Sequence, residues 1–123
     1  MAGNDVTAPA TFLLTRNAAL DLRRIHTRSR REWGEAVADQ YLDDLYAAMG
    51  IAATNPEMGR LRQCRSAPFL MVPVRQHFVI YDFVPQGIVV LTVQHQVRDI
   101  ETLIAELTPA FVTEVERLKR KVY

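Results

Sequence analysis

HFVIYDFVPQGIVVLTVQH, residues 77–95, decides the fold of this chain of 123 residues. Two runs of β-branched and aromatic residues, 77–84 and 88–93, flank Pro85-Gln86-Gly87, a sequence typical of a tight turn. We therefore expect a β-hairpin. A third run, FLMVPV at 69–74, adds another strand, and Pro73 places it at a sheet edge or a bulge because proline cannot donate to a ladder.

N-terminal to these strands the sequence predicts one further strand and then two helices, because the apolar residues change from an extended run to helical spacing. TFLLT at 11–15 predicts a first strand, and apolar residues at helical spacing predict a helix that ends at Trp33-Gly34. A second helix ends at Asn55-Pro56, and the short connection makes the two antiparallel neighbours. The apolar stripe expected for the second helix is Val37, Tyr41, Leu45, Ala48 and Ala52, widened by Leu42 and Met49.

Behind the hairpin, Asp99 is expected to cap a helix that runs to residue 107. Thr108-Pro109 then predicts a new start, with threonine as N-cap and proline at the first helical position. Its apolar face is expected to hold Phe111, Val112, Val115, Leu118 and Val122. The fold class is therefore α+β: an N-terminal strand, an α-helical hairpin, a three-stranded antiparallel-rich sheet and a C-terminal helix. We expect a flexible tail at 1–11, one domain at 12–107 and an amphipathic helix at 108–123.

Charge is distributed in blocks although the net charge is only +1. Residues 16–31 carry six arginines and one acid, and residues 32–57 carry six acids and no base. Either the basic and acidic helices attract each other within the hairpin, or the basic helix is a binding surface; the sequence leaves both open. A protein that acts mainly on nucleic-acid phosphates is usually basic as a whole, and this one is not.

Several classes of protein are disfavoured by composition. The single cysteine, Cys64, allows no internal disulfide and fits a reducing cytoplasm. Apolar stretches end well before the ~18 residues that cross a bilayer, and the N-terminus lacks the pattern of a secretion signal. The three histidines, His26, His77 and His95, show no spacing of paired metal ligands. We expect a cytoplasmic protein with no metal and no cofactor.

An ordered set of short motifs resembles the ParE branch of the ParE/RelE toxin superfamily of type II toxin–antitoxin systems. In chain order they are Ala18, Asp21-Leu22 and Ile25; Trp33-Gly34; Tyr41-Leu42 and Leu45; Asn55-Pro56-Glu57-Met58-Gly59; residues 74–81; and His95 with Arg98-Asp99-Ile100. The resemblance covers roughly residues 12 to 104. It implies the fold already expected and a toxin, with a role in plasmid stabilisation, that a cognate antitoxin silences.

The resemblance leaves two mechanisms open. RelE-type members are ribosome-dependent endonucleases that cut messenger RNA, whereas ParE-type members poison DNA gyrase and block replication. Three positions depart from the pattern: Thr92 stands where an arginine is frequent, Asp82 where a base is frequent, and Gln94 where an apolar residue is usual. The changes at Thr92 and Asp82 remove positive charge from the face that would meet a phosphate.

Four residues would carry the chemistry of a nuclease: Arg75, Tyr81, His95 and Arg98. Cleavage by the 2′-hydroxyl needs a base, an acid and a cation near the phosphorus. The structural interpretation is simpler, with Tyr81 half-buried in the sheet, Arg75 paired with an acid, and His95 bonded to backbone at the strand end. We adopt it and expect no catalytic residue.

The expected function is therefore binding: the toxin inhibits DNA gyrase and is neutralised by a DNA-binding, ParD-like antitoxin in a hetero-oligomeric complex. The antitoxin would lay a helix and a strand across an apolar groove. The residues expected to line that groove are Leu22, Ile25, Trp33, Tyr41, Leu45, Phe78 and Ile80. A ribosome-dependent nuclease is the main alternative, and an inactive toxin kept as the antitoxin's partner is a third.

Overall fold

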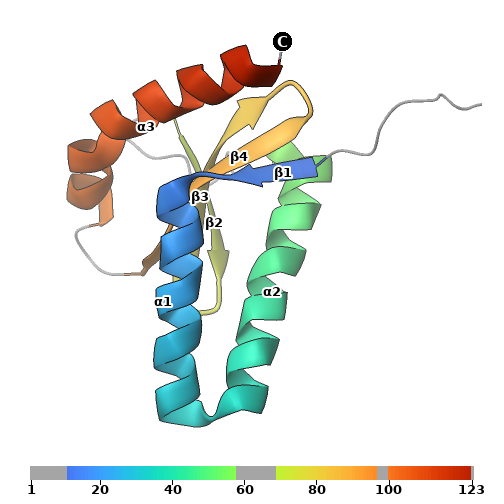
Figure 1. The fold of residues 1–123 in the computed structure, drawn as a ribbon, viewed down its shortest axis with the longest axis vertical. Coiled ribbons are helices and arrows are strands. Elements are labelled where there is room, and N and C mark those ends of the chain that lie inside the picture. The colour runs from blue at the N-terminus through green and yellow to red at the C-terminus, as the bar shows by residue number, and fades with distance from the viewer. Residues whose placement is uncertain (1–10, 58–68, 97–99, 123) are drawn as a thin grey trace, which may run out of the picture.

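The computed structural model describes residues 11–57, 69–96 and 100–122, which form an α+β fold as predicted. The element order is β1 (Thr11–Leu14), α1 (Arg16–Trp33), α2 (Glu35–Thr54), β2 (Leu70–Val74), β3 (His77–Val84), β4 (Gly87–His95) and α3 (Ile100–Val122) (Figure 1). All predicted strands and both helices of the hairpin are present. In the part of the chain described here, no helix combines the length and apolarity that a bilayer crossing needs.

The strands form one sheet in the order β1-β4-β3-β2. Strands β2, β3 and β4 are antiparallel neighbours, and β1 pairs in parallel with β4. The sheet therefore has four strands and is mixed, whereas the sequence predicted three strands and a separate first one. Pro73 lies in β2, at an edge of the sheet as predicted, where its missing N–H interrupts only one ladder.

An irregularity in β4 sets the register of the central hairpin. Tyr81 lies opposite Val90, but Ile80 lies opposite Thr92, so Leu91 is an extra residue in β4. Without this bulge, the turn would place His77 opposite Gln94. With it, His77 lies opposite His95, where the strand pair ends.

Helices cover both faces of the sheet. The helical hairpin packs on one face over a core that includes Leu22, Leu45, Met49, Val79, Tyr81, Ile88 and Val90. Helix α3 packs on the other face through Phe111 and Val115, against Phe69, Phe78, Ile80, Val89 and Leu91. Successive residues of a strand thus pack alternately against the helical hairpin and against α3, because side chains along a strand point to opposite faces of the sheet.

Local contacts fix the two ends of α1. The Thr15 hydroxyl accepts a hydrogen bond from Ala18 N at 3.0 Å, which caps the helix, and donates to the Leu91 carbonyl at 2.7 Å, which ties it to β4. Gly34 ends the helix with φ 92°, a left-handed conformation that suits glycine.

The predicted stripe of α2 was wrong at Val37, which is 49 % exposed; Ala38 is buried in its place.

The predicted helix start at Thr108-Pro109 was also wrong, because α3 continues through both residues. Proline removes one helical hydrogen bond and disfavours an interior position. Burial of Phe111 and Val115 against the sheet offsets that cost, and the rings of Phe69 and Phe111 meet edge to face at 5.9 Å. Val112 is 44 % exposed and lies outside the predicted apolar face.

Some predictions fall outside the described residues: the tail over 1–10, Cys64, Arg98 and the helix cap at Asp99. The side chains of Leu118 and Val122 are likewise outside them.

Candidate functional site

Two histidines and a tyrosine meet where β3 begins and β4 ends. The imidazole rings of His77 and His95 lie edge to face with centroids 5.3 Å apart, and the ring of Tyr41 from α2 meets His77 at 5.5 Å. We call Tyr41, His77 and His95 the imidazole cluster. It joins the helical hairpin to the end of the sheet where β3 begins and β4 ends, which we call the open end.

Hydrogen bonds hold this cluster to the turn between β2 and β3. The Tyr41 hydroxyl lies 2.6 Å from His77 Nδ1 and accepts from the backbone N–H of Gln76 at 3.2 Å. The side-chain amide of Gln96 donates to the carbonyls of Arg75 and His77, both at 3.0 Å. The Tyr41 hydroxyl therefore holds the His77 ring, and Gln96 holds the backbone on either side of the turn.

His77 is neutral near pH 7. Burial, followed by the nearby charges of His95 and Arg28, lowers the pKa of His77 to about 4. In the neutral ring one nitrogen donates and the other accepts, so Nδ1 and the Tyr41 hydroxyl share one hydrogen bond whose direction depends on the tautomer. A base with so low a pKa is poorly matched to proton abstraction at neutral pH.

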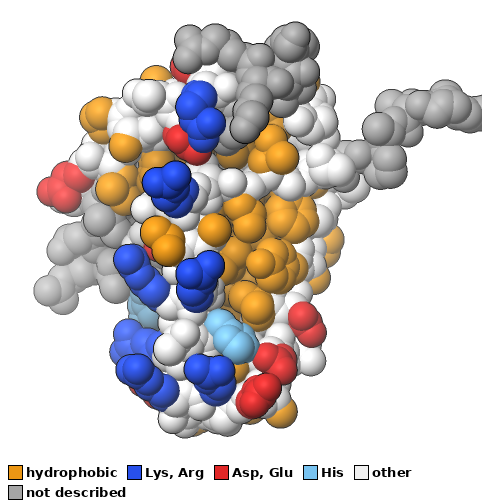
Figure 2. Space-filling model, viewed as in Figure 1, with side chains coloured by type: hydrophobic (Ala, Val, Ile, Leu, Met, Phe, Trp, Pro, Cys, Tyr) orange, Lys and Arg blue, Asp and Glu red, His pale blue; other side chains and the backbone are white. Residues whose placement is uncertain are grey.

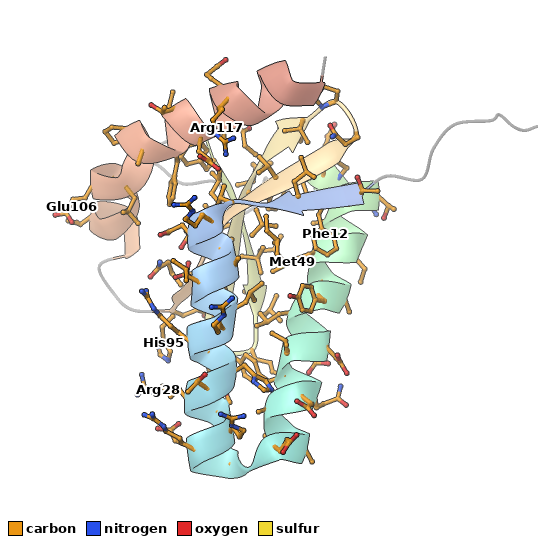
Figure 3. All side chains as sticks on the ribbon, viewed as in Figure 1. Phe12, Arg28, Met49, His95, Glu106 and Arg117 are labelled. Carbon is orange, nitrogen blue, oxygen red and sulfur yellow. The ribbon has the colours of Figure 1, made fainter. Side chains whose placement is uncertain are left out.

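The cluster borders an open hollow of about 230 Å³. Its walls are Arg24, Ile25, Arg28, Ser29, Glu32 and Trp33 of α1, with Tyr41, Gln76, His77 and His95. Figure 3 shows Arg28 and His95 on the same side of α1. Trp33, one of the residues predicted to line the antitoxin groove, is 68 % exposed, because the hairpin ends at its position and leaves no core for it to enter.

Arg75 is held by an acid, as the structural interpretation expected. Its Nε donates to Asp44 Oδ2 at 2.6 Å, and its guanidinium lies 5.6 Å from the centre of the Tyr41 ring. Hydrogen bonds from Gln40 and Arg75 lower the pKa of Asp44. Arg75 lies in the turn rather than in a strand and has φ 52°.

Tyr81 lies away from the imidazole cluster. Its side chain is fully buried rather than half-buried, and its hydroxyl donates to the Pro56 carbonyl at 2.5 Å. His77 precedes it by four residues on β3, roughly 13 Å at ~3.3 Å per residue. The structure thus separates Tyr81 from His95, and Arg98 lies outside the described residues.

Thr92 and Gln94 form part of a polar link between β4 and α1. Asp21 Oδ2 accepts from the Thr92 hydroxyl at 2.5 Å and from Val93 N at 3.1 Å. The Gln94 amide donates to the Thr92 hydroxyl at 2.7 Å. Two positions that depart from the toxin pattern therefore serve a buried network. The third, Asp82, accepts a hydrogen bond from the N–H of Phe83 at 2.8 Å.

The seven residues expected to form an antitoxin groove do not share one surface. Leu22 and Leu45 are buried under the hairpin, with Ile25 and Tyr41 at its margin, whereas Phe78 and Ile80 face α3 across the sheet. A different apolar hollow of about 340 Å³ lies between α1 and α2. It is lined by Leu14, Ala19, Leu22, Arg23, His26, Leu42 and Tyr46.

The imidazole cluster was not predicted as a unit. The sequence offered His95 but gave no reason to join His77 and Tyr41 to it, since the His77–His95 pairing depends on the β4 bulge and the Tyr41–His77 contact joins residues far apart in the chain. No group of three or more potential ligands among His, Cys, Asp and Glu comes together within the described ranges. Two arginines, a neutral imidazole and an exposed indole are suited to holding an anion rather than to moving a proton.

Comparison with known proteins bears on the identity of the chain. Residues 12–100 match the family model described as ParE toxin of type II toxin-antitoxin system, parDE. A structure described as a chromosomal ParDE TA system from P. aeruginosa is similar, with a TM-score of 0.49 and 16 % identity over 71 % of this chain and 96 % of that chain. No curated protein sequence matches significantly.

Proposed function

The chain belongs to the ParE toxin family of type II toxin–antitoxin systems, and we propose that it acts by binding DNA gyrase and blocking replication. It performs no chemistry of its own and needs no cofactor. This follows the mechanism of the ParE branch, and both gyrase and its DNA substrate place the toxin in the cytoplasm.

One observation carries the choice of binding over catalysis: of the three described residues that a nuclease would need, two are held by other partners. The Tyr81 hydroxyl is buried against the Pro56 carbonyl, and Arg75 is paired with Asp44. The remaining described candidate, His95, lies beside an imidazole that is neutral near pH 7. Without a matched acid and base, cleavage by the 2′-hydroxyl is unsupported.

We further propose that a ParD-like antitoxin neutralises the toxin in a hetero-oligomeric complex. The hollow between α1 and α2 supports this, because it is mainly apolar and includes the partly exposed ring of Tyr46. An amphipathic antitoxin helix would bury apolar side chains there. Of the seven residues predicted for the groove, only Leu22 lines this hollow.

The function is tested by incubating purified toxin with two systems. One contains gyrase and relaxed plasmid, and the other contains translating ribosomes and a defined message. Loss of supercoiling or accumulation of cleaved plasmid, with the message intact, is the expected result. Cut message with normal supercoiling would instead establish the nuclease.

Two variants sharpen this test. Tyr81→Phe keeps the ring and removes the hydroxyl, so a binding toxin should retain its effect on gyrase. His95→Gln removes the exposed imidazole and should likewise leave message cleavage absent and supercoiling inhibited. A message-cutting activity that either change abolishes would overturn the binding mechanism.

A further inference from the structure

Helix α1 presents a row of arginines to solvent. We call Arg16, Arg23, Arg24, Arg28 and Arg31 the α1 arginine face; all five are exposed. Figure 2 shows basic side chains in a column over α1, with acidic ones gathered apart over the lower part of α2. The two charge blocks of the sequence thus lie side by side without merging.

The acids of α2 do not neutralise this face. Within the described residues, the polar side-chain contact that joins the two helices is between His26 Nε2 and Asp39 Oδ1 at 2.8 Å, and it involves no arginine. Asp44 is taken by Arg75, from the β2–β3 turn. In the part of the chain that the structure describes, the arginines of α1 thus make no close ion pair with α2, and the binding alternative gains support.

The arginine face is continuous with the hollow at the imidazole cluster. A shallow depression of about 550 Å³ is lined by Arg23, Arg24, Thr27, Arg28, Arg31 and Glu32. Arg24 and Arg28 line both hollows. The field of Arg28 reaches His77, whose pKa it helps to lower, so positive potential extends across the boundary. Glu32 opposes it only weakly, at 3.6 Å from Arg28.

We propose that the α1 arginine face, with Arg24 and Arg28 at its centre, binds the phosphate backbone of DNA. The inference rests on the proposed function, because DNA accompanies gyrase wherever the toxin would meet it. The contact would be independent of sequence and would strengthen the hold of the toxin on gyrase engaged with DNA.

Shape and charge favour DNA over an acidic protein segment. Arg16 and Arg31 are separated by fifteen residues of helix, roughly 22 Å at 1.5 Å per residue. A duplex presents about one negative charge per 1.7 Å over that length and is already rigid, whereas a flexible acidic peptide must be ordered to match it. Guanidinium groups also bind phosphate in a bidentate geometry that lysine, absent from α1, does not provide.

The test is the affinity of the toxin alone for a short fluorescent DNA duplex, measured by anisotropy over a series of salt concentrations. Each phosphate contact contributes about 0.9 to the log–log salt slope. Replacing Arg24 or Arg28 by Gln should make the slope shallower by about that amount, and replacing both by about 1.8. Glutamine retains a good helix propensity, so circular dichroism should be unchanged.

Two further variants distinguish a binding face from a general charge effect. Arg30 is exposed but lines neither of the two hollows that Arg24 and Arg28 share, so Arg30→Gln removes the same charge away from the proposed centre of binding. It should change the slope less than Arg28→Gln does. Glu32→Gln removes the acid beside Arg28 and should tighten binding, a gain that loss of structure would not produce.

Two results would overturn the proposal. One is a duplex affinity that does not differ between the wild type and the Arg24→Gln, Arg28→Gln double variant. The other is stronger binding of polyglutamate than of duplex at equal charge, which would assign the face to an acidic protein. The duplex assay contains no topoisomerase, so it is independent of the proposed function. DNA binding without gyrase inhibition would contradict only the proposed function. Gyrase inhibition without DNA binding would contradict only this inference.

Discussion

The sheet face under the helical hairpin is buried at one end and open to solvent at the other. His77, Val79 and Tyr81 alternate along β3 toward the helical hairpin, and the ring of Tyr81 is fully buried where the chain leaves α2, with its hydroxyl on the Pro56 carbonyl. At the other end His77 is only half-buried and lies beside an open hollow. One strand thus carries a structural tyrosine and an accessible imidazole four residues apart.

Residue type alone therefore does not separate structural from functional residues in this chain. Tyr81 and His95 are both plausible catalysts in a sequence, and only their surroundings distinguish them. At the closed end a polar group must have a partner within the protein, because water does not reach it. At the open end the same groups remain able to meet a ligand. The predictions below test that contrast.

The largest expected effect is at the closed end. Tyr81→Ala removes a fully buried ring and should lower the free energy of unfolding by about 3–5 kcal/mol, as large aromatic truncations in cores do. Trp33→Ala, at the open end, removes a ring that is 68 % exposed and should change it by about 0.5 kcal/mol or less. Urea unfolding of both variants measures the difference, and equal losses would contradict the contrast.

A smaller loss is expected between the two ends, where Asp21 ties α1 to β4. Asp21→Ala leaves the Thr92 hydroxyl and the Val93 N–H without their acceptor in a buried site, at a cost of about 2–3 kcal/mol. Thr92→Val removes one of these bonds and the one that Gln94 donates to the hydroxyl, and it should cost less because Asp21 still accepts from Val93 N. If the variant with both Asp21→Ala and Thr92→Val is as stable as Asp21→Ala alone, the two side chains act as one unit. Losses of unfolding free energy that simply add would show that the two side chains act independently.

The next effect is a pH dependence at the open end. The pKa of His77 is about 4 in the folded protein, below the ~6.5 of an unfolded chain, so the unfolded state binds more protons between these values. Stability should therefore rise from about pH 4 to about pH 7, by about 1–2 kcal/mol once the exposure of the half-buried ring is allowed for.

Comparing the wild type with His77→Gln by urea unfolding at both pH values isolates this contribution, which should vanish in the variant. His95→Gln removes one cause of the shift, so the pKa of His77 should rise in an NMR titration. An unchanged pH dependence in His77→Gln would show that other groups are responsible.

Sequence patterns predicted most of this architecture for a physical reason. Runs such as 77–84 and 88–93 are apolar on both sides because helices cover both faces of the sheet, and the hairpin helices carry regular stripes. The local sequence led to a wrong prediction where tertiary packing overrode the preference of proline for the start of a helix. Pro109 looked like a helix start, but burial of Phe111 and Val115 holds one helix across it.

The candidate site was less predictable, because it depends on register and on long-range pairing. Only the extra residue in β4 brings His95 rather than Gln94 opposite His77. The contact of Tyr41 with His77 joins residues 36 apart, which no local pattern encodes. Exposure of Trp33 follows from where the hairpin ends, a property of the whole fold.

The smallest expected effect concerns the turn that carries Arg75 at the open end. Arg75 has φ 52°, a conformation strained for residues with a Cβ, and its ion pair is exposed and so contributes little. Ala and Gly at this position both remove the pair, so their difference isolates the backbone. Arg75→Gly should be more stable than Arg75→Ala by about 1 kcal/mol in urea unfolding. Equal stabilities would mean that the turn relaxes when the guanidinium releases Asp44, and that this end of the sheet is shaped by the ion pair rather than by the backbone.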